Sequence, residues 1–499
     1  MSPSRRKFIQ SAPGLTLPVL KSDAGEGSPT AIENRKAGTT DWQLTRVKIN
    51  EGNYRTSLIE GYASRQSVLP GEEIAFYVST RPAREFTLDL YRMGYYGGTG
   101  GRHLKRLGPL EGQEQPVPEM GEKRLRECQW EESTSLVTPD DWQSGVYLGK
   151  LTTVPETESE PYWQSYVIFV VRSRKPASVV FQVSDNTWQA YNRWPVNESL
   201  YTNPDGAQAP GVAVSFDRPY GKYVQITDNP LSIGSGEFLL WEFPLCFWLE
   251  KEGYSVSYVS NSDLVDRSAI DGADVFLSVG HDEYWDVRQF RTVQQAIDAG
   301  MNVLWLCGNS VFIDSPFSAS AKGVPNRIIE RKGCYGELRQ DETDSYAGIL
   351  GALQSTAPDE RKIMGVRSVV PFNGGGDWTC RNPGHWVFGG TGMAEGDSIP
   401  GLVGWEHHGE PDPEREDLEI LAAGKVWAGG VREGAYSSVI FPGPKGNVVF
   451  NASTIFWSQG LASPPGHWVP YSHFSRPHGP DERVIAMTRN LLARALHSW

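Results

Sequence analysis

The clearest indication of the fold lies in residues 273–308, ADVFLSVGHDEYWDVRQFRTVQQAIDAGMNVLWLCG. The two ends of this stretch, 273–280 and 301–308, are short apolar runs typical of buried strands. A helix is predicted over 286–300, because apolar side chains recur there at helical spacing: Val287, Phe290, Val293 and Ile297. Gly300 is placed to end that helix. A strand–helix–strand unit of this kind predicts two parallel strands joined by a right-handed crossover.

The same alternation extends over the second part of the chain. Two further strands are predicted at 178–184 and 254–260, and a buried helix at 236–253. A hairpin is predicted at 437–453, and a last helix from Asp481 to Leu496. The remainder beyond residue 345 is rich in loops. We therefore expect residues 176–499 to form an α/β catalytic domain with a mainly parallel sheet.

The first part of the chain has a different pattern. Between residues 41 and 175, short stretches of alternating apolar residues are separated by turn signals such as Pro70-Gly71. Many short strands without helices predict an immunoglobulin-like β-sandwich. No catalytic cluster is evident there, so this domain is expected to support the second one or to dock a partner.

Residues 1–40 are interpreted as a leader and a linker. Ser4-Arg5-Arg6-Lys7-Phe8-Ile9 resembles a twin-arginine export signal, and a polar segment rich in Gly, Ser and Glu follows at 22–40. The expected location is periplasmic or extracellular. If the leader is not functional and is only a disordered basic tail, the location is cytoplasmic.

Composition excludes some functions. The 499 residues have a formal net charge of −13 and contain no basic stripe, which argues against binding to nucleic acid. No apolar run is long enough to predict a membrane span. None of the five cysteines forms a Cys-x-x-Cys pair, so a zinc–thiolate site is not expected. Cys334 and Cys380 are candidates for a disulfide if the chain is exported.

The polar residues that follow the predicted parallel strands are the candidates for a functional site, because ligands bind beyond the carboxyl ends of such strands. The candidates on this rim are Tyr191, His281, Asp282, Glu283 and Asn309. His281 and Glu283 lie two residues apart, so in an extended loop they point the same way. One of them could bind a metal while the other moves protons.

Each candidate also has an ordinary structural interpretation. The His281 loop could be a solvated turn in which Asp282 or Asp286 caps the next helix. Tyr191 could be an aromatic packing residue, and Asn309 a loop residue that satisfies backbone groups. Tyr220, which follows a proline in the stretch SFDRPYGKY, indicates little alone.

Two other functions remain open at this stage. Cys307 lies at a strand end before Gly308 and could be the nucleophile of a thiol hydrolase with a glutamine-amidotransferase-like fold. The residue before it, Leu306, is larger than a sharp nucleophile turn prefers. Alternatively, the 17 tryptophans could belong to a non-enzymatic exported protein that binds a ligand such as a carbohydrate, although tryptophan is more often buried.

Several longer stretches resemble one family over about residues 50–495. They are IEGYASRQSVLPGEEIAFYVS, YRMGYYGGTGGRHL, DNTWQAYNRW, SVGHDEYWD, CGNSVF, HWVFGGTGMAEGDSIPGLVGWE and FNASTIFW. Together they are similar to the large (beta) subunit of N,N-dimethylformamidase, C-terminal catalytic region. The resemblance implies a glutamine-amidotransferase-like α/β fold that has no cysteine nucleophile.

The resemblance also implies a mononuclear Fe(III) held by two tyrosines and a glutamate. Carried over by motif, the metal ligands are Tyr191, Glu283 and Tyr220, with Tyr223 as the alternative to Tyr220. By the same likeness, the catalytic residues are His281, Asn309 and Glu406. Phenolate and carboxylate oxygens are hard anionic ligands that suit ferric iron.

The implied activity is hydrolysis of the C–N bond of a small amide by metal-activated water. The family implies a small accessory subunit, and a homo-oligomer is a further possibility. Members also carry an additional N-terminal lectin-like domain, for which this chain has no room. The site is therefore expected to be kept, while the substrate can differ.

Overall fold

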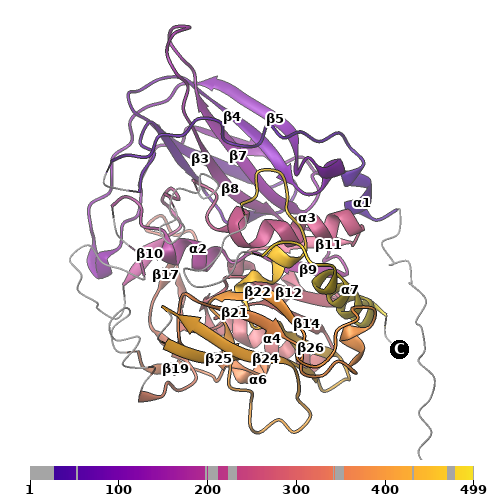
Figure 1. The fold of residues 1–499 in the computed structure, drawn as a ribbon. Helices are drawn as coiled ribbons and strands as arrows, with labels where there is room; N and C mark the ends of the chain where they lie inside the picture. The colour runs from indigo at the N-terminus through magenta and orange to yellow at the C-terminus, as the bar shows by residue number, and fades with distance from the viewer. Residues whose placement is uncertain are drawn as a thin grey trace, which may run out of the picture.

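Two β-sheets form the N-terminal part of the structure, a computed structural model (Figure 1). It describes residues 27–51, 54–196, 199–200, 212–222, 233–340, 342, 353–429, 432–468 and 478–497. One sheet has the order β1 (Ile59–Ala63), β3 (Glu73–Thr80), β6 (Thr134–Val137). The other has the order β2 (Ser67–Val68), β8 (Gln164–Val171), β7 (Gly145–Thr153), β4 (Phe86–Met93), β5 (Gly101–Leu110).

These two sheets enclose one apolar core. Side chains of both contribute to it, among them Phe76 of β3, Leu88 of β4 and Phe169 of β8, all nearly inaccessible to solvent. β3 is buried along nearly its whole length, whereas most residues of β5 are exposed or half-buried. The N-terminal part is thus a layered β structure.

A nine-stranded sheet forms the second part. Its order is β11 (Val256–Val259), β9 (Val179–Gln182), β12 (Val275–Gly280), β14 (Asn302–Cys307), β26 (Val448–Asn451), β25 (Arg432–Pro442), β24 (Glu419–Ala428), β21 (Gly374–Thr379), β22 (Ser398–Trp405). The first five strands are parallel neighbours, and the last four pairings are antiparallel. Both parts together make the fold a mixed α/β one.

The prediction of a mainly parallel sheet was therefore wrong for the later strands. β25 and β26 are joined by only five residues, 443–447, and so short a connection can link only antiparallel strands. The strand–helix–strand unit at 273–308 is confirmed: helix α4 (Val287–Ala299) connects β12 to β14. Asp286 caps α4 and Gly300 ends it with φ of +107°.

Helices cover the nine-stranded sheet, and α3 lies between it and the N-terminal sheets (Figure 1). The predicted long helix is α3 (Phe243–Glu252), preceded by a π-helical turn, Phe238–Glu242. The last helix, predicted from Asp481 to Leu496, is α7 (Glu482–Leu496), and Asp481 is its N-cap. Two shorter helices are α2 (Asp185–Tyr191) and α6 (Arg361–Met364). None of the described helices combines the length and apolarity needed to cross a membrane.

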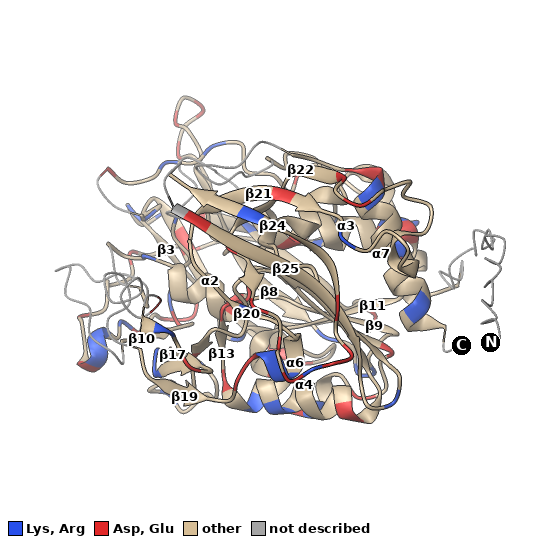
Figure 2. Ribbon diagram, turned by 60° about the horizontal axis from the view of Figure 1, so that its bottom comes forward, with Lys and Arg blue, Asp and Glu red and all other residues tan. Residues whose placement is uncertain are grey.

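The segment interpreted as a linker contains helix α1 (Pro29–Asn34), with Ser28 as its N-cap and proline at its first position. Residues 1–26, which include the twin-arginine-like stretch, lie outside the described residues. Among the described residues, Lys and Arg are interspersed with Asp and Glu over the outer elements, α4 included (Figure 2). All five cysteines are buried and free, so Cys334 and Cys380 are not paired.

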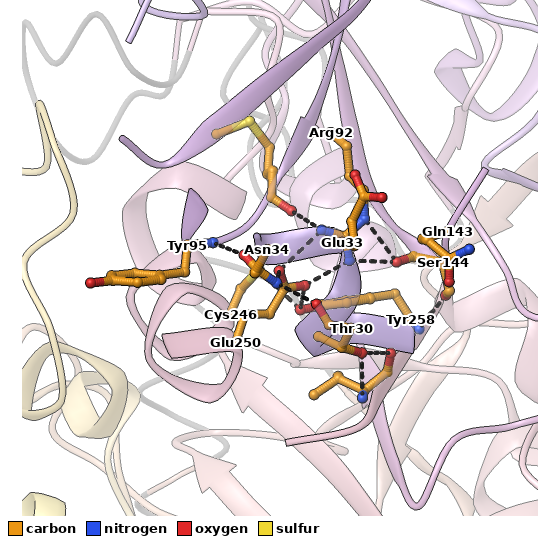
Figure 3. Close-up of polar contacts among 12 residues, drawn as sticks. Thr30, Glu33, Asn34, Arg92, Tyr95, Gln143, Ser144, Cys246, Glu250 and Tyr258 are labelled. Atoms are coloured by element: carbon orange, nitrogen blue, oxygen red, sulfur yellow. Dashed lines mark hydrogen bonds and ion pairs between the residues drawn. The ribbon is translucent and has the colours of Figure 1, made fainter. Parts of the chain in front are cut away.

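A buried ion pair joins the two parts (Figure 3). Arg92 of β4 donates through Nη2 to Glu250 Oε1 of α3 at 2.8 Å, and through Nη1 to Glu250 Oε2 at 3.0 Å. Glu250 also accepts from Tyr258 Oη at 2.9 Å and from Asn34 Nδ2 of α1 at 2.7 Å. Both charged side chains are fully buried, so this contact fixes α1 and α3 against β4.

We expect Arg92→Met to lower the free energy of unfolding by about 3–5 kcal/mol, because it leaves the Glu250 carboxylate buried without its charged partner. Urea denaturation measures the change. The double variant Arg92→Met/Glu250→Leu should recover much of the loss, since no uncompensated charge remains. Lys425→Met, in an exposed pair with Glu433, should cost less than about 1 kcal/mol. A loss for Arg92→Met as small as that of the exposed pair contradicts the prediction.

Candidate functional site

Four chain segments converge at the carboxyl ends of neighbouring strands. Helix α2 follows β9 and ends at Tyr191. The loop after β12 carries His281 and Glu283, and the turn after β14 carries Asn309. Glu406 follows β22, which belongs to the antiparallel half of the same sheet. The structure thus brings together five residues that lie as far as 215 positions apart in the sequence, and all five are buried.

The backbone at these strand ends is unusual. Gly280 has φ of +72°, and a Cβ there would meet Trp241 Cβ at 2.8 Å. A Cβ on Gly308 would lie 2.4 Å from the carbonyl oxygen of Glu406, so glycine lets the two loops approach each other. Asn309 and Trp405 have φ of +52° and +65°. Non-glycine residues in this region are strained, and such strain concentrates at functional sites.

The side chains form a tight cluster around the imidazole of His281. Tyr191 Oη donates to Glu283 Oε2 at 2.7 Å. His281 Nε2 lies 2.9 Å from Glu406 Oε2 and 3.5 Å from Glu283 Oε2. Asn309 Nδ2 donates to Glu406 Oε2 at 3.1 Å. Although Nε2 of His281 is close to both carboxylates, it makes no hydrogen bond of proper geometry with the described residues, and neither does Asn309 Oδ1.

The charges that surround His281 and Glu283, together with their burial, explain the shifts in the pKa values of these two groups. Burial alone would lower the pKa of His281, but the carboxylates of Glu406 and Glu237 reverse that effect and hold it well above the usual value. Burial raises the pKa of Glu283 to about 7, while the nearby His281 ring opposes that rise. Perturbed titrating groups of this kind are typical of functional sites.

Asp282, between the two site residues, points the other way and anchors their loop. Its carboxylate accepts from Gln182 Nε2 at 2.6 Å, Ser278 Oγ at 2.7 Å and Asn261 Nδ2 at 3.1 Å. These donors come from β9, β12 and the turn after β11. Asp286, not Asp282, caps the following helix. The helix-cap interpretation therefore holds for Asp286, while His281 and Glu283 line a buried centre instead of a solvated turn.

Among the described residues, Tyr220 makes no hydrogen bond to this cluster. Its ring packs edge-on against Trp188, with ring centroids 6.3 Å apart, and it lines a small cavity together with Asp185. Burial holds the pKa of its hydroxyl well above the usual value, and the Asp185 carboxylate adds to this. Tyr223, the alternative to Tyr220, lies outside the described residues.

Glu237 belongs to the cluster and was missed in the sequence. Its Oε2 lies 3.2 Å from His281 Nδ1, and its side chain is buried. The signal was present: an acidic residue at the start of the apolar run 236–253, where a charge has no ordinary place. The tryptophans, by contrast, serve mainly as core, because ten of the 17 are fully buried.

The fold and the site together define an enzyme of mixed α/β architecture with a buried acid–imidazole centre at its strand ends. His281, Glu283 and Glu406 offer ligand atoms within 4.8 Å of one another and form a group that could hold a metal ion. Residues 87–471 match the family model described as N,N-dimethylformamidase beta subunit-like, C-terminal. The chain therefore belongs to this family, which confirms the resemblance and implies an amidohydrolase acting on a small molecule.

Other comparisons add nothing to this assignment. No curated protein matched the chain. Among solved structures, a family 123 glycoside hydrolase from Clostridium perfringens, studied for glycolipid glycan hydrolysis, is similar at 11% identity and a TM-score of 0.12. The similarity covers 28% of this chain and 32% of that one, and no inference rests on it.

Cys307 is poorly suited to act as a nucleophile. It is fully buried, and burial raises the pKa of its thiol to about 12, so the reactive thiolate is scarce near neutral pH. Ser278 Oγ donates to its sulfur at 3.5 Å. We expect Cys307→Ala to keep amide turnover within about threefold of wild type, measured as kcat/KM, because nucleophile removal typically costs orders of magnitude more. Loss of turnover in a folded variant would restore the thiol mechanism.

Asp185 gives a pH-dependent prediction. Its Oδ1 accepts from the Asn261 backbone N–H at 2.7 Å, but its Oδ2 is buried without a hydrogen-bond partner among the described residues, beside a cavity of about 30 Å³. Burial raises the pKa of Asp185 from 3.8 to about 8. The folded state therefore holds a proton that the unfolded chain releases, and stability falls as pH rises through this window.

We expect Asp185→Asn to remove this fall, because asparagine does not titrate and can keep the bond from Asn261. Between about pH 5 and pH 8, wild type should lose about 3–4 kcal/mol more unfolding free energy than the variant. Urea denaturation at both pH values measures the difference. Asp140→Asn, on an exposed carboxylate, is the control and should track wild type. Parallel loss in wild type and Asp185→Asn contradicts the prediction.

Proposed function

We propose that the protein is an iron-dependent hydrolase that cleaves the C–N bond of a small amide with water, as N,N-dimethylformamidase does. The observation that supports this most directly is the buried cluster in which Tyr191 Oη, Glu283, His281 and Glu406 lie within contact distance of one another. Family membership supports the amidohydrolase class.

The donor set fits a bound ferric ion. Three buried carboxylates surround His281: those of Glu237, Glu283 and Glu406. Among the described residues, His281 is the one cationic group that pairs with all three. Buried negative charge in excess of its partners is costly unless a cation compensates it. Oxygen and imidazole donors suit iron. We propose that Tyr191, Glu283 and Tyr220 hold the ion, with His281, Asn309 and Glu406 around it.

When bound, the iron would supply a Lewis acid that polarises the amide carbonyl and favours deprotonation of water. The protein residues supply the remaining parts. Asn309 uses one N–H of its amide on Glu406 and has a second for the developing oxyanion, a contribution of about 3 kcal/mol. Glu406 and His281 are paired at 2.9 Å, so Glu406 can take the proton of water and the protonated His281 can deliver one to the leaving amine.

Hydrolysis of the amide adds one water molecule across the C–N bond. Water adds its oxygen to the carbonyl carbon, and its proton moves to the Glu406–His281 pair. That pair returns the proton to the amide nitrogen as the C–N bond breaks, so the products are a carboxylic acid and an amine. Exclusion of bulk water by the buried walls strengthens each of these charge interactions.

Three further proposals concern architecture and location. We propose that the N-terminal sheets are an immunoglobulin-like sandwich over residues 41–175 and that residues 176–499 are a glutamine-amidotransferase-like domain. The twin-arginine-like leader supports export of the folded, iron-loaded protein. A small accessory subunit or a homo-oligomer is proposed from the family alone.

We expect purified protein to contain iron and to show a visible phenolate-to-iron absorption band. Tyr191→Phe should remove most of the band and weaken iron binding about 10–100-fold, because a direct oxygen donor is lost. Tyr220→Phe should act in the same way. Tyr284→Phe is the matched control: its ring packs 6.1 Å from that of Tyr191, and the variant should keep the band.

Two outcomes would decide against the proposal. A colourless, iron-free protein with full amidase activity refutes the metal role. If Tyr191→Phe loses the band and Tyr220→Phe keeps it, the assignment of Tyr220 as a ligand is wrong, and Glu406 is the better candidate for the third ligand.

A further inference from the structure

Glu237 is the residue that contacts the far side of the His281 ring. Its Oε2 lies 3.2 Å from Nδ1, whereas Glu406 and Glu283 approach Nε2. The ring is therefore held between carboxylates at both nitrogens. When Glu237 is ionised, its carboxylate can only accept a hydrogen bond, and the proton of this contact then lies on Nδ1.

The segment that carries Glu237 is rigid. The Glu237 carbonyl oxygen accepts from the backbone N–H groups of Leu240 and Trp241, both at 3.0 Å. Gln459 Nε2 donates to the Leu240 carbonyl at 2.9 Å, and Ser458 Oγ donates to that of Trp241. Together these bonds pin the π-helical turn Phe238–Glu242, a rare element that often occurs at functional sites.

The second oxygen of Glu237 is in an unfavourable position. Oε1 is buried and makes no hydrogen bond of full geometry with the described residues, although the Trp241 side chain interacts with the carboxylate and opposes the rise in pKa that burial causes. Native structures rarely leave such an atom without a strong partner, so its presence needs a reason. The contact with His281 provides one, because it is the interaction that the carboxylate would lose if it turned away.

We infer that Glu237 is a positioning residue that fixes the orientation and the tautomer of His281, so that Nε2 faces Glu406 and Glu283 and can exchange a proton there. The effect of Glu237 on turnover rests on the proposed function, but its effect on the orientation of the His281 ring does not. The arrangement follows a general rule: a carboxylate on one imidazole nitrogen determines which proton the other can transfer.

The ring can be observed in the metal-free protein. ¹⁵N-resolved NMR of histidine, with His281→Gln used to assign the signal, should show Nδ1 protonated and its hydrogen-bonded proton far downfield in wild type. Glu237→Leu should lose that downfield proton, and Glu237→Gln should move it upfield, because the neutral amide is a weaker acceptor. If Glu237→Leu does not fold, Glu237→Gln decides the result.

Turnover provides the second measurement, on iron-loaded protein with N,N-dimethylformamide. For Glu237→Gln we expect kcat to fall about 100-fold, KM to change less than about threefold, and bound iron to stay at the wild-type level. The matched control is Glu242→Gln, a buried glutamate five residues on, which accepts from Trp188 Nε1 at 2.7 Å and does not contact His281. Its kcat should stay within about threefold of wild type.

These measurements test the positioning role of Glu237 separately from the proposed amidase function. If Glu237→Gln leaves the ring signals of His281 unchanged, or if Glu242→Gln changes them equally, the positioning role is overturned. A wild-type protein that has neither iron nor amidase activity overturns the proposed function. The ring signals of the metal-free protein still decide the role of Glu237 in that case.

Discussion

The imidazole of His281 sits in a buried site among three carboxylates, and this is the interaction on which the rest of the site depends. So much charge can stay away from water only if each group has a partner at short range and the surrounding chain holds it there. The anchoring of Asp282 by three donors, the pinned turn at Glu237 and the close approach of Gly308 to Glu406 all serve that requirement. They explain why strained backbone is found at Asn309 and Trp405.

Sheet topology brings these groups to one place. Parallel strands β9, β12 and β14 present their ends on one edge, which places the residues that follow them side by side. The antiparallel half of the sheet adds Glu406 from β22, at a distance in sequence that no local pattern encodes. The mixed sheet thus places the carboxylate of Glu406, which follows an antiparallel strand, beside the residues at the ends of the parallel strands.

The sequence predicted the parts of the site that follow local rules. Apolar runs marked β12, α4 and β14, and the residues after them therefore pointed to His281, Glu283 and Asn309. Glu406 was found only through the family resemblance, because its loop follows a strand that periodicity did not reveal. Glu237 was missed, since an acidic residue inside an apolar run looks like an exception to a buried helix. The hairpin of β25 and β26 was predicted at 437–453, but the other antiparallel strands β21, β22 and β24 were missed, because Gly-rich, half-exposed stretches such as β21 give little alternation.

One continuous segment, residues 237–252, touches both the buried centre and the N-terminal sheets. It begins at the carboxylate beside His281 and carries, thirteen positions later, the glutamate that pairs with Arg92 of β4. The place of the imidazole is thus tied, through a single stretch of chain, to a strand of the N-terminal part.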